Sequence, residues 1–519
     1  MIANAPSTYG MPRSYAPACE AVPVTDPHPA TGDLARLGIG GLRAEQDAGE
    51  RTCHGIVSAL LDRIAAVDAP DSPIALRSVL QVAPDALASA SARDDERASG
   101  SPLGPLHGIP ILVKDNIQSV GLPGSAGSLA LANRPVTVDA PLITRLRQAG
   151  AVIIGATNLS EWANFRSPNS VSGWSAVGGL TGNPWALDRS AGGSSAGSGA
   201  AVAAGLAPVA IGTETNGSIT CPAALNGVVG LKPTVGSVPT VGVVPISASQ
   251  DVPGPLGRSV RDVALVYEVL SGRDDCMSAC TVEAAATLRV GTVGAWLTGH
   301  AGTDAAFAAA VDALAAHVAG VRPVYTAFTP STVDDDQVTV LIGELLDDMD
   351  AYLSTRSGEG ARSLADVVAF NLANADTELA VFGQEYFERS VAMGGRASVA
   401  YQEARARNVA WAQDECLIPA MTDVDVLIAP AYRPAWKSDL TNGDQLHGGG
   451  VVCTPAAILG WPTLTVPMGL VDGLPVGLSI VGPPNSEPAL LAVGQALEEA
   501  LSLLTSGALQ PTWRPPIRG

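Results

Sequence analysis

The sequence predicts a single large α/β domain, with a central mixed, mostly parallel β-sheet covered by helices on both faces. Of the 519 residues, 47% are hydrophobic and only 15% are charged, which provides the apolar surface for a large buried core. From about residue 105, short β-rich runs alternate with Ala-rich helical stretches. β-rich runs return after residue 441, as expected if one sheet is interrupted and then completed.

The elements follow in order along this domain. Residues 1–32 are rich in Pro and Ala and predict a loosely ordered lead-in, so that 33–519 form the domain. Between 33 and 68 apolar residues recur three and four apart, which indicates amphipathic helices. Strands are then predicted at IPILV (109–113), AVIIGA (151–156), LAPVAIG (206–212) and GVVGL (227–231).

The second half of the chain begins with a segment of different composition. Residues 275–440 are more helical and more acidic, and they predict an insertion that covers the substrate side of the domain. Two further strands are expected in PTLTVPMGL (462–470) and LPVGLSIVG (474–482), before a last helix near 488–504. No internal repeat or linker divides the domain.

Charge and cysteine content exclude several classes of function. A net charge of −20, from 50 acidic and 30 basic residues, argues against a nucleic-acid or anionic-membrane partner and favours a small neutral or cationic substrate. The 7 scattered cysteines are not a disulfide scaffold, although pairing of Cys276 with Cys280 stays open. No His or Cys cluster predicts a metal. The sequence carries no recognisable signal peptide or transmembrane run, so we expect a cytoplasmic protein.

The uncharged run AGGSSAGSGAAVAAG at 191–205 has the composition of a linker but the position of a functional turn. A helix over 195–205 runs about 15 Å, and a strand over 206–212 returns about 20 Å. The start of the helix and the end of the strand therefore meet, at the sheet edge where α/β proteins bind ligands. Ser194 and Ser218 are expected to lie close together there.

A serine hydroxyl needs a base before it becomes a nucleophile. None of the 6 histidines stands in a context that marks it as that base: His28, His54, His107, His300, His317 and His447. Only three residues are lysine, and burial can lower the pKa of a lysine enough for it to lose its proton, whereas arginine stays charged. Lys114 follows an apolar strand and precedes a Gly-rich loop, which fits either a base or a salt bridge to Asp115 or another carboxylate. Lys232 is predicted to be structural and Lys437 to be solvated.

Several motifs together resemble the amidase signature family over roughly residues 35–270 and 445–500. They are GPLHGIPILVKDNI, AGGSSAGSGAAVAAG, IGTETNGSITCPAALNGVVGLKPT and LGWPTLTVPMGLVDGLPVGLSIVG. Within this family the segments TNLSEWANFRS, SGWSAVGG, GTETNGSITCPA and FGQEYFERS are similar to bacterial peptide amidases, which remove the C-terminal amide of peptides.

The resemblance implies a Ser-cisSer-Lys triad. Ser218 would be the nucleophile, Ser194 the bridging serine after a cis peptide bond, and Lys114 the base. The backbone N–H groups of Thr215, Asn216, Gly217 and Ser218 would form the oxyanion hole. An acyl-enzyme would form and water, the second substrate, would hydrolyse it, with no metal or cofactor. The substrate would be a peptide amide or a related primary amide, and the enzyme a monomer or homodimer.

The sequence departs from the family pattern around the nucleophile. Glu214 and Thr220 stand where many members have an Asp and an Arg, so a hydrogen bond between these two side chains is expected in place of the charged pair. Asn216 replaces a common glycine, and its side chain either enters the pocket or caps the turn. Cys221 is expected to pack beneath the site.

Other functions compete with this one. GSSAG at 193–197 fits the G-x-S-x-G pattern of an α/β-hydrolase, with Ser195 as nucleophile and His447 as its partner, but no buried strand is predicted immediately before it. A phosphate loop is disfavoured because no G-K-[ST] follows the glycines. The remaining alternatives are hydrolysis of aryl or fatty amides or of esters, and delivery of ammonia within an amidotransferase.

Overall fold

The computed structural model describes residues 34–326, 333–445, 450, 452–502 and 509–514. One 11-stranded sheet runs through the molecule in the order β1-β3-β2-β8-β10-β9-β14-β15-β13-β11-β12. Its strands are β1 (Val79–Val82), β2 (Pro110–Lys114), β3 (Val152–Thr157), β8 (Val209–Glu214), β9 (Val229–Lys232), β10 (Val252–Gly257), β11 (Arg289–Val293), β12 (Gly320–Val324), β13 (Val426–Pro430), β14 (Thr463–Val471) and β15 (Leu474–Val481). Two small sheets pair β4 (Trp174–Ser175) with β5 (Gly179–Leu180), and β6 (Gly182–Asn183) with β7 (Ala186–Ser190).

The mixed α/β sheet expected as mostly parallel is present as a mixed sheet with four parallel and six antiparallel pairings, and its parallel ladders are concentrated in two places. Strands β3, β2 and β8 are parallel neighbours, and so are β13, β11 and β12. The strands between these groups pair antiparallel, from β8 through β10, β9, β14 and β15 to β13. The hairpin of β14 and β15 explains part of this pattern, because strands joined by a tight turn can only pair antiparallel.

Helices cover both faces of the sheet, as predicted. Alternate residues of β14 point to opposite sides: Leu464 lies against Gly494 of α19 (Glu487–Leu501), whereas Thr465 lies against Gly477 of β15 beside α7 (Thr220–Asn226). The helices that complete the first half of the chain are α1 (Ile39–Asp47), α2 (Cys53–Val67), α3 (Ala86–Ala98), α4 (Leu129–Ala132), α5 (Pro141–Gln148), α6 (Ala196–Ala203) and α8 (Val260–Ser271).

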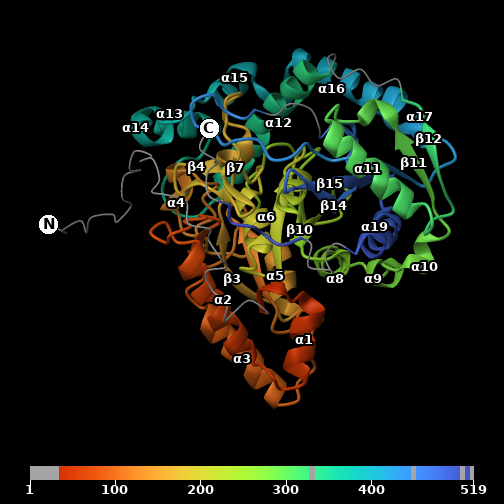
Figure 1. Ribbon diagram of the computed structural model, residues 1–519. Coiled ribbons are helices and arrows are strands. Elements are labelled where there is room, and N and C mark those ends of the chain that lie inside the picture. The colour runs from red at the N-terminus through yellow and green to blue at the C-terminus, as the bar shows by residue number, and fades with distance from the viewer. Residues whose placement is uncertain (1–33, 327–332, 446–449, 451, 503–508, 515–519) are drawn as a thin grey trace.

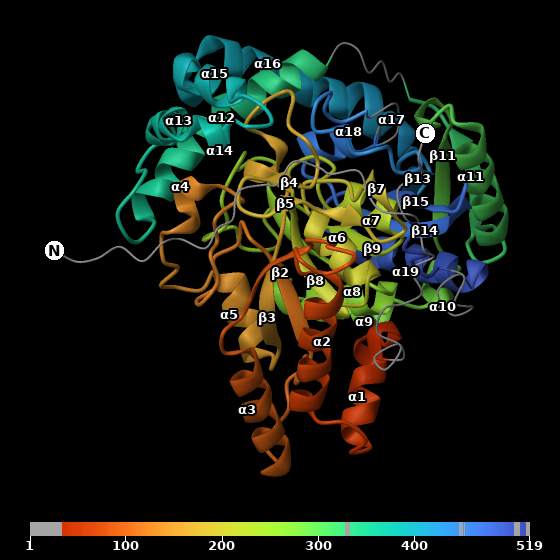
Figure 2. The same cartoon turned by 60° about the vertical axis from the view of Figure 1, so that its left-hand side comes forward.

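The remaining helices belong to the second half of the chain, and many of them gather at one end of the molecule. Figures 1 and 2 show α12–α16 at the end opposite to α1–α3. The bounds are α9 (Cys276–Ala279), α10 (Val282–Ala285), α11 (Ala301–Leu314), α12 (Asp334–Thr355), α13 (Leu364–Ala373), α14 (Ala375–Glu378), α15 (Glu385–Met393), α16 (Val399–Ala410), α17 (Ile418–Ala420) and α18 (Cys453–Ile458). Short turns of other helix types lie at Leu34–Arg36, Glu161–Asn164, Gly294–Trp296, Gly395–Ala397 and Trp411–Leu417.

The structure corrects the predicted content of one segment and the predicted bounds of two elements. Segment 275–440 is not only helical, because β11, β12 and β13 lie within it and form one edge of the main sheet. These strands are short and flanked by long Ala-rich and acidic helices, whose composition dominates the segment. The helix expected over 195–205 is the shorter α6, and the strand expected at 206–212 is β8, which ends later, at Glu214.

Other expectations concern the cysteines, the termini and membranes. Cys276 and Cys280 are both buried free thiols, so they form no disulfide. The expected lead-in at 1–32 lies outside the described residues. Among the described residues, no helix has the length and apolar character needed to cross a membrane. The cytoplasmic location stays a prediction.

Candidate active site

The carboxyl ends of two parallel strands hold the lysine of the site. β2 pairs with β8, so Lys114 at the end of β2 lies beside Thr213 of β8. Lys114 Nζ donates to Thr213 Oγ1 at 2.9 Å and to the Thr213 carbonyl oxygen at 3.3 Å. Asn116 Nδ2 donates to the same hydroxyl at 2.9 Å. Thr213 therefore fixes the position of the Lys114 amine.

The same amine contacts Ser194 just before α6. Lys114 Nζ donates to Ser194 Oγ at 2.8 Å, and both residues are 0% exposed. The Gly193–Ser194 peptide bond is cis, as the resemblance implied. The Ser160 N–H donates to the Ser194 carbonyl oxygen at 3.0 Å. Ser194 is thus held from its backbone while its hydroxyl points to the lysine.

Asp115 does not pair with Lys114. Its carboxylate accepts hydrogen bonds from the N–H groups of Gly124 and Ser125 at 2.8 and 3.0 Å, and from the Ser125 hydroxyl. Among the described residues, no ion pair joins Lys114 to Asp115 or to another carboxylate, and its Nζ instead donates to Ser194 and Thr213. The salt-bridge interpretation of Lys114 is therefore not supported.

Ser218 lies beside the Ser194 turn and is 8% exposed. The Ser195 N–H donates to the Ser218 carbonyl oxygen at 3.1 Å, which ties the two serine-bearing turns together. No hydrogen bond among the described residues joins the hydroxyls of Ser194 and Ser218. The structure thus brings all three predicted triad residues to one place, where Ser218 is the one that retains access to solvent.

Ser195, the nucleophile of the alternative α/β-hydrolase interpretation, has a bracing role. It is 0% exposed, and its hydroxyl donates to the Thr213 carbonyl oxygen at 3.1 Å and accepts from the Thr213 N–H at 3.2 Å. A short strand, β7, does precede this turn, but it pairs with β6 outside the main sheet. His447 lies outside the described residues.

The carboxylate of Glu214 organises the turn that carries Ser218. It accepts hydrogen bonds from the N–H groups of Gly217, Ile219 and Thr220 at 2.9, 2.7 and 2.9 Å. It also accepts from Thr220 Oγ1 at 3.2 Å, which is the contact expected in place of the family's charged pair. Several N–H donors to the Glu214 carboxylate thus stabilise this turn in place of an ion pair with an arginine.

This arrangement changes the predicted oxyanion hole. The Gly217 N–H already donates to Glu214 and is therefore not available to an oxyanion in this structure. No hydrogen bond to a described residue occupies the N–H groups of Thr215, Asn216 or Ser218. Gly217 itself has φ of +84°, and a Cβ there would lie 2.6 Å from Tyr432 Oη, so this position of the turn requires glycine.

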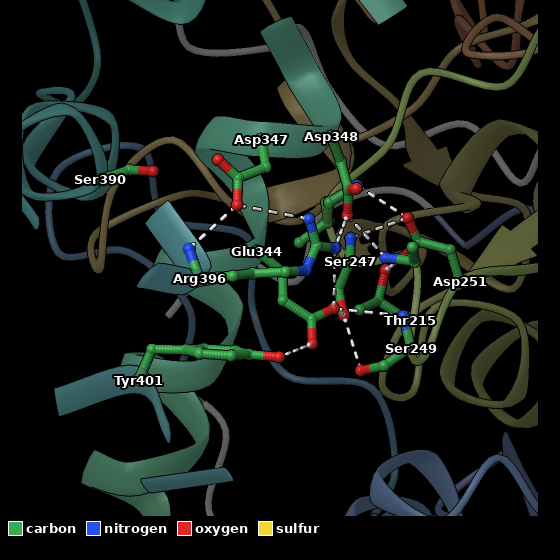
Figure 3. Close-up of polar contacts among 12 residues, drawn as sticks. Thr215, Ser247, Ser249, Asp251, Glu344, Asp347, Asp348, Ser390, Arg396 and Tyr401 are labelled. Carbon is green, nitrogen blue, oxygen red and sulfur yellow. Dashed lines mark hydrogen bonds and ion pairs between the residues drawn. The ribbon is translucent and has the colours of Figure 1, made fainter. Parts of the chain in front are cut away.

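Asp251 is a buried neighbour of both Thr215 and Lys114. Thr215 Oγ1 donates to Asp251 Oδ1 at 2.5 Å, and Figure 3 shows the two side chains facing one another. Burial raises the pKa of Asp251 to about 6, although three hydrogen bonds to its carboxylate act to lower this pKa. Asp251 lies outside every motif, and Thr213 lies within IGTETNGSIT but nothing in that motif indicated its role, because both roles depend on contacts between different strands.

Burial lowers the pKa of Lys114 to about 7, although the carboxylates of Asp251 and Glu214 act in the opposite direction. Near neutral pH a large share of Lys114 is therefore uncharged and able to accept a proton. Lys232 is also buried, but its Nζ donates to the Trp461 carbonyl oxygen at 2.8 Å, which fits the predicted structural role. Lys437 is exposed, as predicted.

Asn216 and Cys221, which replace or flank family residues around the nucleophile, both contact other parts of the fold. Asn216 Nδ2 donates to Thr454 Oγ1 of α18 at 3.1 Å, so it neither caps its own turn nor is free in the pocket. Cys221 is 5% exposed and packs in a hydrophobic cluster, as predicted, and burial raises the pKa of its thiol. In the described ranges, no group of His, Cys, Asp and Glu is arranged to hold a metal ion.

Comparisons with known proteins agree with this geometry. The amidase family model matches residues 55–491. The native peptide amidase from Stenotrophomonas maltophilia is 42% identical, with a TM-score of 0.84 over 92% of this chain and 98% of that chain. A peptide amidase in complex with the competitive inhibitor chymostatin is 42% identical, with a TM-score of 0.86 over 92% of this chain and 99% of that chain.

The curated relatives include a component of a larger enzyme. A glutamyl-tRNA(Gln) amidotransferase subunit from Salinispora arenicola is 35% identical and aligns with 92% of this chain and 100% of its own length. The family match, the shared fold and these identities show that the protein is a member of the amidase signature family of amide-hydrolysing enzymes.

Proposed function

We propose that this enzyme hydrolyses the C-terminal amide of peptides, with Ser218 as nucleophile, Ser194 as proton relay and Lys114 as base. The observation that carries the triad is the 2.8 Å contact between Lys114 Nζ and the hydroxyl of Ser194, which lies next to the turn of Ser218. The 42% identity to peptide amidases supports the substrate class.

The reaction proceeds in two halves. Neutral Lys114 takes a proton from Ser194 as Ser194 takes the proton of Ser218, and Ser218 Oγ forms a bond to the amide carbon. The free N–H groups of Thr215, Asn216 and Ser218 stabilise the oxyanion. The proton returns through Ser194 to the leaving nitrogen, the C–N bond breaks, and ammonia departs. Water then attacks the ester of Ser218 and releases the peptide acid.

A substrate panel tests the substrate class. We expect a peptide carboxamide to be hydrolysed at least about 10-fold more efficiently than an aryl amide, a fatty amide or an ester, because binding energy from the peptide is used in the transition state. Hydrolysis of the primary amides is measured by ammonia release, and hydrolysis of the other substrates by chromatography of the products. A preference for aryl or fatty amides would contradict the peptide assignment, and the Ser218→Ala protein controls for contaminating activity.

The second candidate function is ammonia delivery within an amidotransferase, which the 35% identity to a component of such an enzyme favours. The purified chain distinguishes the two functions, because a subunit that depends on a partner has little activity alone. Turnover of peptide amides by the chain eluting as a monomer or homodimer in gel filtration supports the stand-alone enzyme. Activity that requires added partner subunits supports the alternative.

The pH profile tests the identity of the base. Only neutral Lys114 accepts a proton, so kcat/KM is expected to rise with pH through an apparent pKa of about 7 and to be lost in acid. Asp251 and Glu214 face this amine and raise its pKa. In the Asp251→Asn variant the acid limb should therefore move to lower pH. If kcat/KM does not fall with decreasing pH between roughly pH 9 and 5, the range expected for a lysine with a lowered pKa, the assignment is contradicted.

A further inference from the structure

A buried carboxylate on α12 is connected to the predicted oxyanion turn although it lies far from it in sequence. Glu344 is 1% exposed. Its carboxylate accepts from Ser247 Oγ at 2.6 Å, from the Ser249 N–H at 3.1 Å and from Tyr401 Oη at 2.9 Å. Burial raises the pKa of Glu344, but these hydrogen bonds outweigh it and hold the pKa below its usual value. The side chain is therefore ionised at neutral pH.

Glu344 contacts the loop of residues 246–249, and backbone N–H groups of the same loop donate hydrogen bonds to Asp251. The N–H groups of Ile246 and Ser247 donate to Asp251 Oδ2 at 2.7 and 2.9 Å. The other oxygen of Asp251 accepts from Thr215 Oγ1 at 2.5 Å. Figure 3 shows this continuous chain of hydrogen bonds, from Glu344 on α12 through Ser247 and Asp251 to Thr215.

The outer side of the network fixes Glu344 and the loop together. Arg396 pairs with Asp348 at 2.7 Å and lies 3.6 Å from Glu344, and the Ala248 N–H donates to Asp348 Oδ2 at 2.8 Å. Figure 3 shows the Arg396 guanidinium among the acidic side chains of α12. Helix α12 thus holds successive loop residues through two carboxylates.

A second, separate chain links α12 to the same turn. Gln250 Nε2 donates to the Thr215 carbonyl oxygen at 3.3 Å, and Gln337 Nε2 donates to Gln250 Oε1 at 3.1 Å. Gln337 and Glu344 are seven residues apart on α12, which places them on one face of the helix. Thr215 is therefore held through its hydroxyl and its carbonyl oxygen by one helix face.

We propose that Glu344 is a positioning residue that acts through Ser247 and Asp251 to hold Thr215, whose N–H begins the oxyanion hole. This inference rests on the proposed oxyanion role of the turn. Catalysis by fixed donors requires that they are in place before charge develops, so small displacements of the turn slow the reaction more than they weaken substrate binding. Glu344 touches no substrate in this proposal.

The test is a double-mutant cycle between Glu344→Gln and Thr215→Val. A carboxamide offers one acceptor oxygen in place of two, so either the loop or Tyr401 loses its acceptor. Each single variant is expected to lower kcat about 10-fold while KM stays within about two-fold, because the lost interaction acts mainly in the transition state. The double variant should lose about the same as one single variant, because both act on one chain of contacts.

Rates are expressed per titrated active serine, so that partial misfolding does not mimic the effect. The control is Asp336→Asn, because Asp336 also joins α12 to α16 by pairing with Arg407 at 2.7 Å, and no hydrogen bond among the described residues joins it to the loop. Its kcat should be unchanged. If Glu344→Gln does not fold, Ser247→Ala replaces it, since this change removes only the hydroxyl that contacts Glu344.

The outcomes separate this inference from the proposed function. Unchanged kcat in Glu344→Gln and Ser247→Ala, or losses that multiply to about 100-fold in the double variant, would overturn the positioning role. If Ser218→Ala is inactive at the same time, the proposed function stands without it. Activity retained in Ser218→Ala would instead overturn the proposed function itself.

Discussion

Replacing Ser218 with alanine is expected to lower kcat by at least about 10⁴-fold, because no other group takes the place of the nucleophile in an acyl-enzyme mechanism. The fold should remain intact, since no hydrogen bond among the described residues depends on the Ser218 hydroxyl. The measurement is a quenched reaction with a slow amide or ester substrate, followed by mass spectrometry of the intact protein. The unaltered enzyme should carry the acyl group and the variant should not.

Ser195→Ala is the matched control for this prediction, since it removes one hydroxyl from the neighbouring turn. Ser195 Oγ bridges the Thr213 carbonyl oxygen and N–H, so its loss should lower the melting temperature and leave the acyl-enzyme detectable on Ser218. If the Ser195→Ala protein carries no acyl group while the Ser218→Ala protein does, Ser195 is the nucleophile and the α/β-hydrolase interpretation returns.

Much of the site follows from local sequence. An apolar run that ends in Lys114, and a Gly/Ser run that leads into an Ala-rich helix, each define their own strand or helix, and the helix-and-return geometry brings Ser194 near Ser218. The replacement of the family's charged pair is also readable, because Glu214 and Thr220 flank one short turn. Their hydrogen bond is present at 3.2 Å.

Other features depend on contacts that no local pattern records. The Gly217 N–H turns to Glu214 because the turn folds around that carboxylate, and a sequence does not specify which way an individual N–H points. Strands β11 and β12 are short and lie among strongly helical segments, so helical composition hides them. Glu344 reaches Ser247 across 97 residues, and neither side chain belongs to a motif.

Replacing Lys114 with methionine is expected to lower kcat by roughly 10³-fold or more, nearly as much as loss of the nucleophile, because groups of a triad act as a unit. Methionine fills similar space but accepts no proton. The rate of acyl-enzyme formation, followed in a rapid-quench experiment, measures the step that the base serves. The acid limb near an apparent pKa of about 7 should also disappear from the residual activity.

A structural role and a catalytic role of Lys114 make different predictions for an arginine at this position. If Lys114 only held Ser194 and Thr213 by hydrogen bonds, then Lys114→Arg, which keeps donors and charge, would retain much of the rate. If Lys114 is the base, arginine is inactive at every pH at which the protein is folded, because its guanidinium stays protonated. Lys437→Met is the control, since Lys437 is exposed and its loss should leave both rate and pH profile unchanged. A Lys114→Arg protein with near-normal acylation would show that the proton of Ser218 leaves by another route.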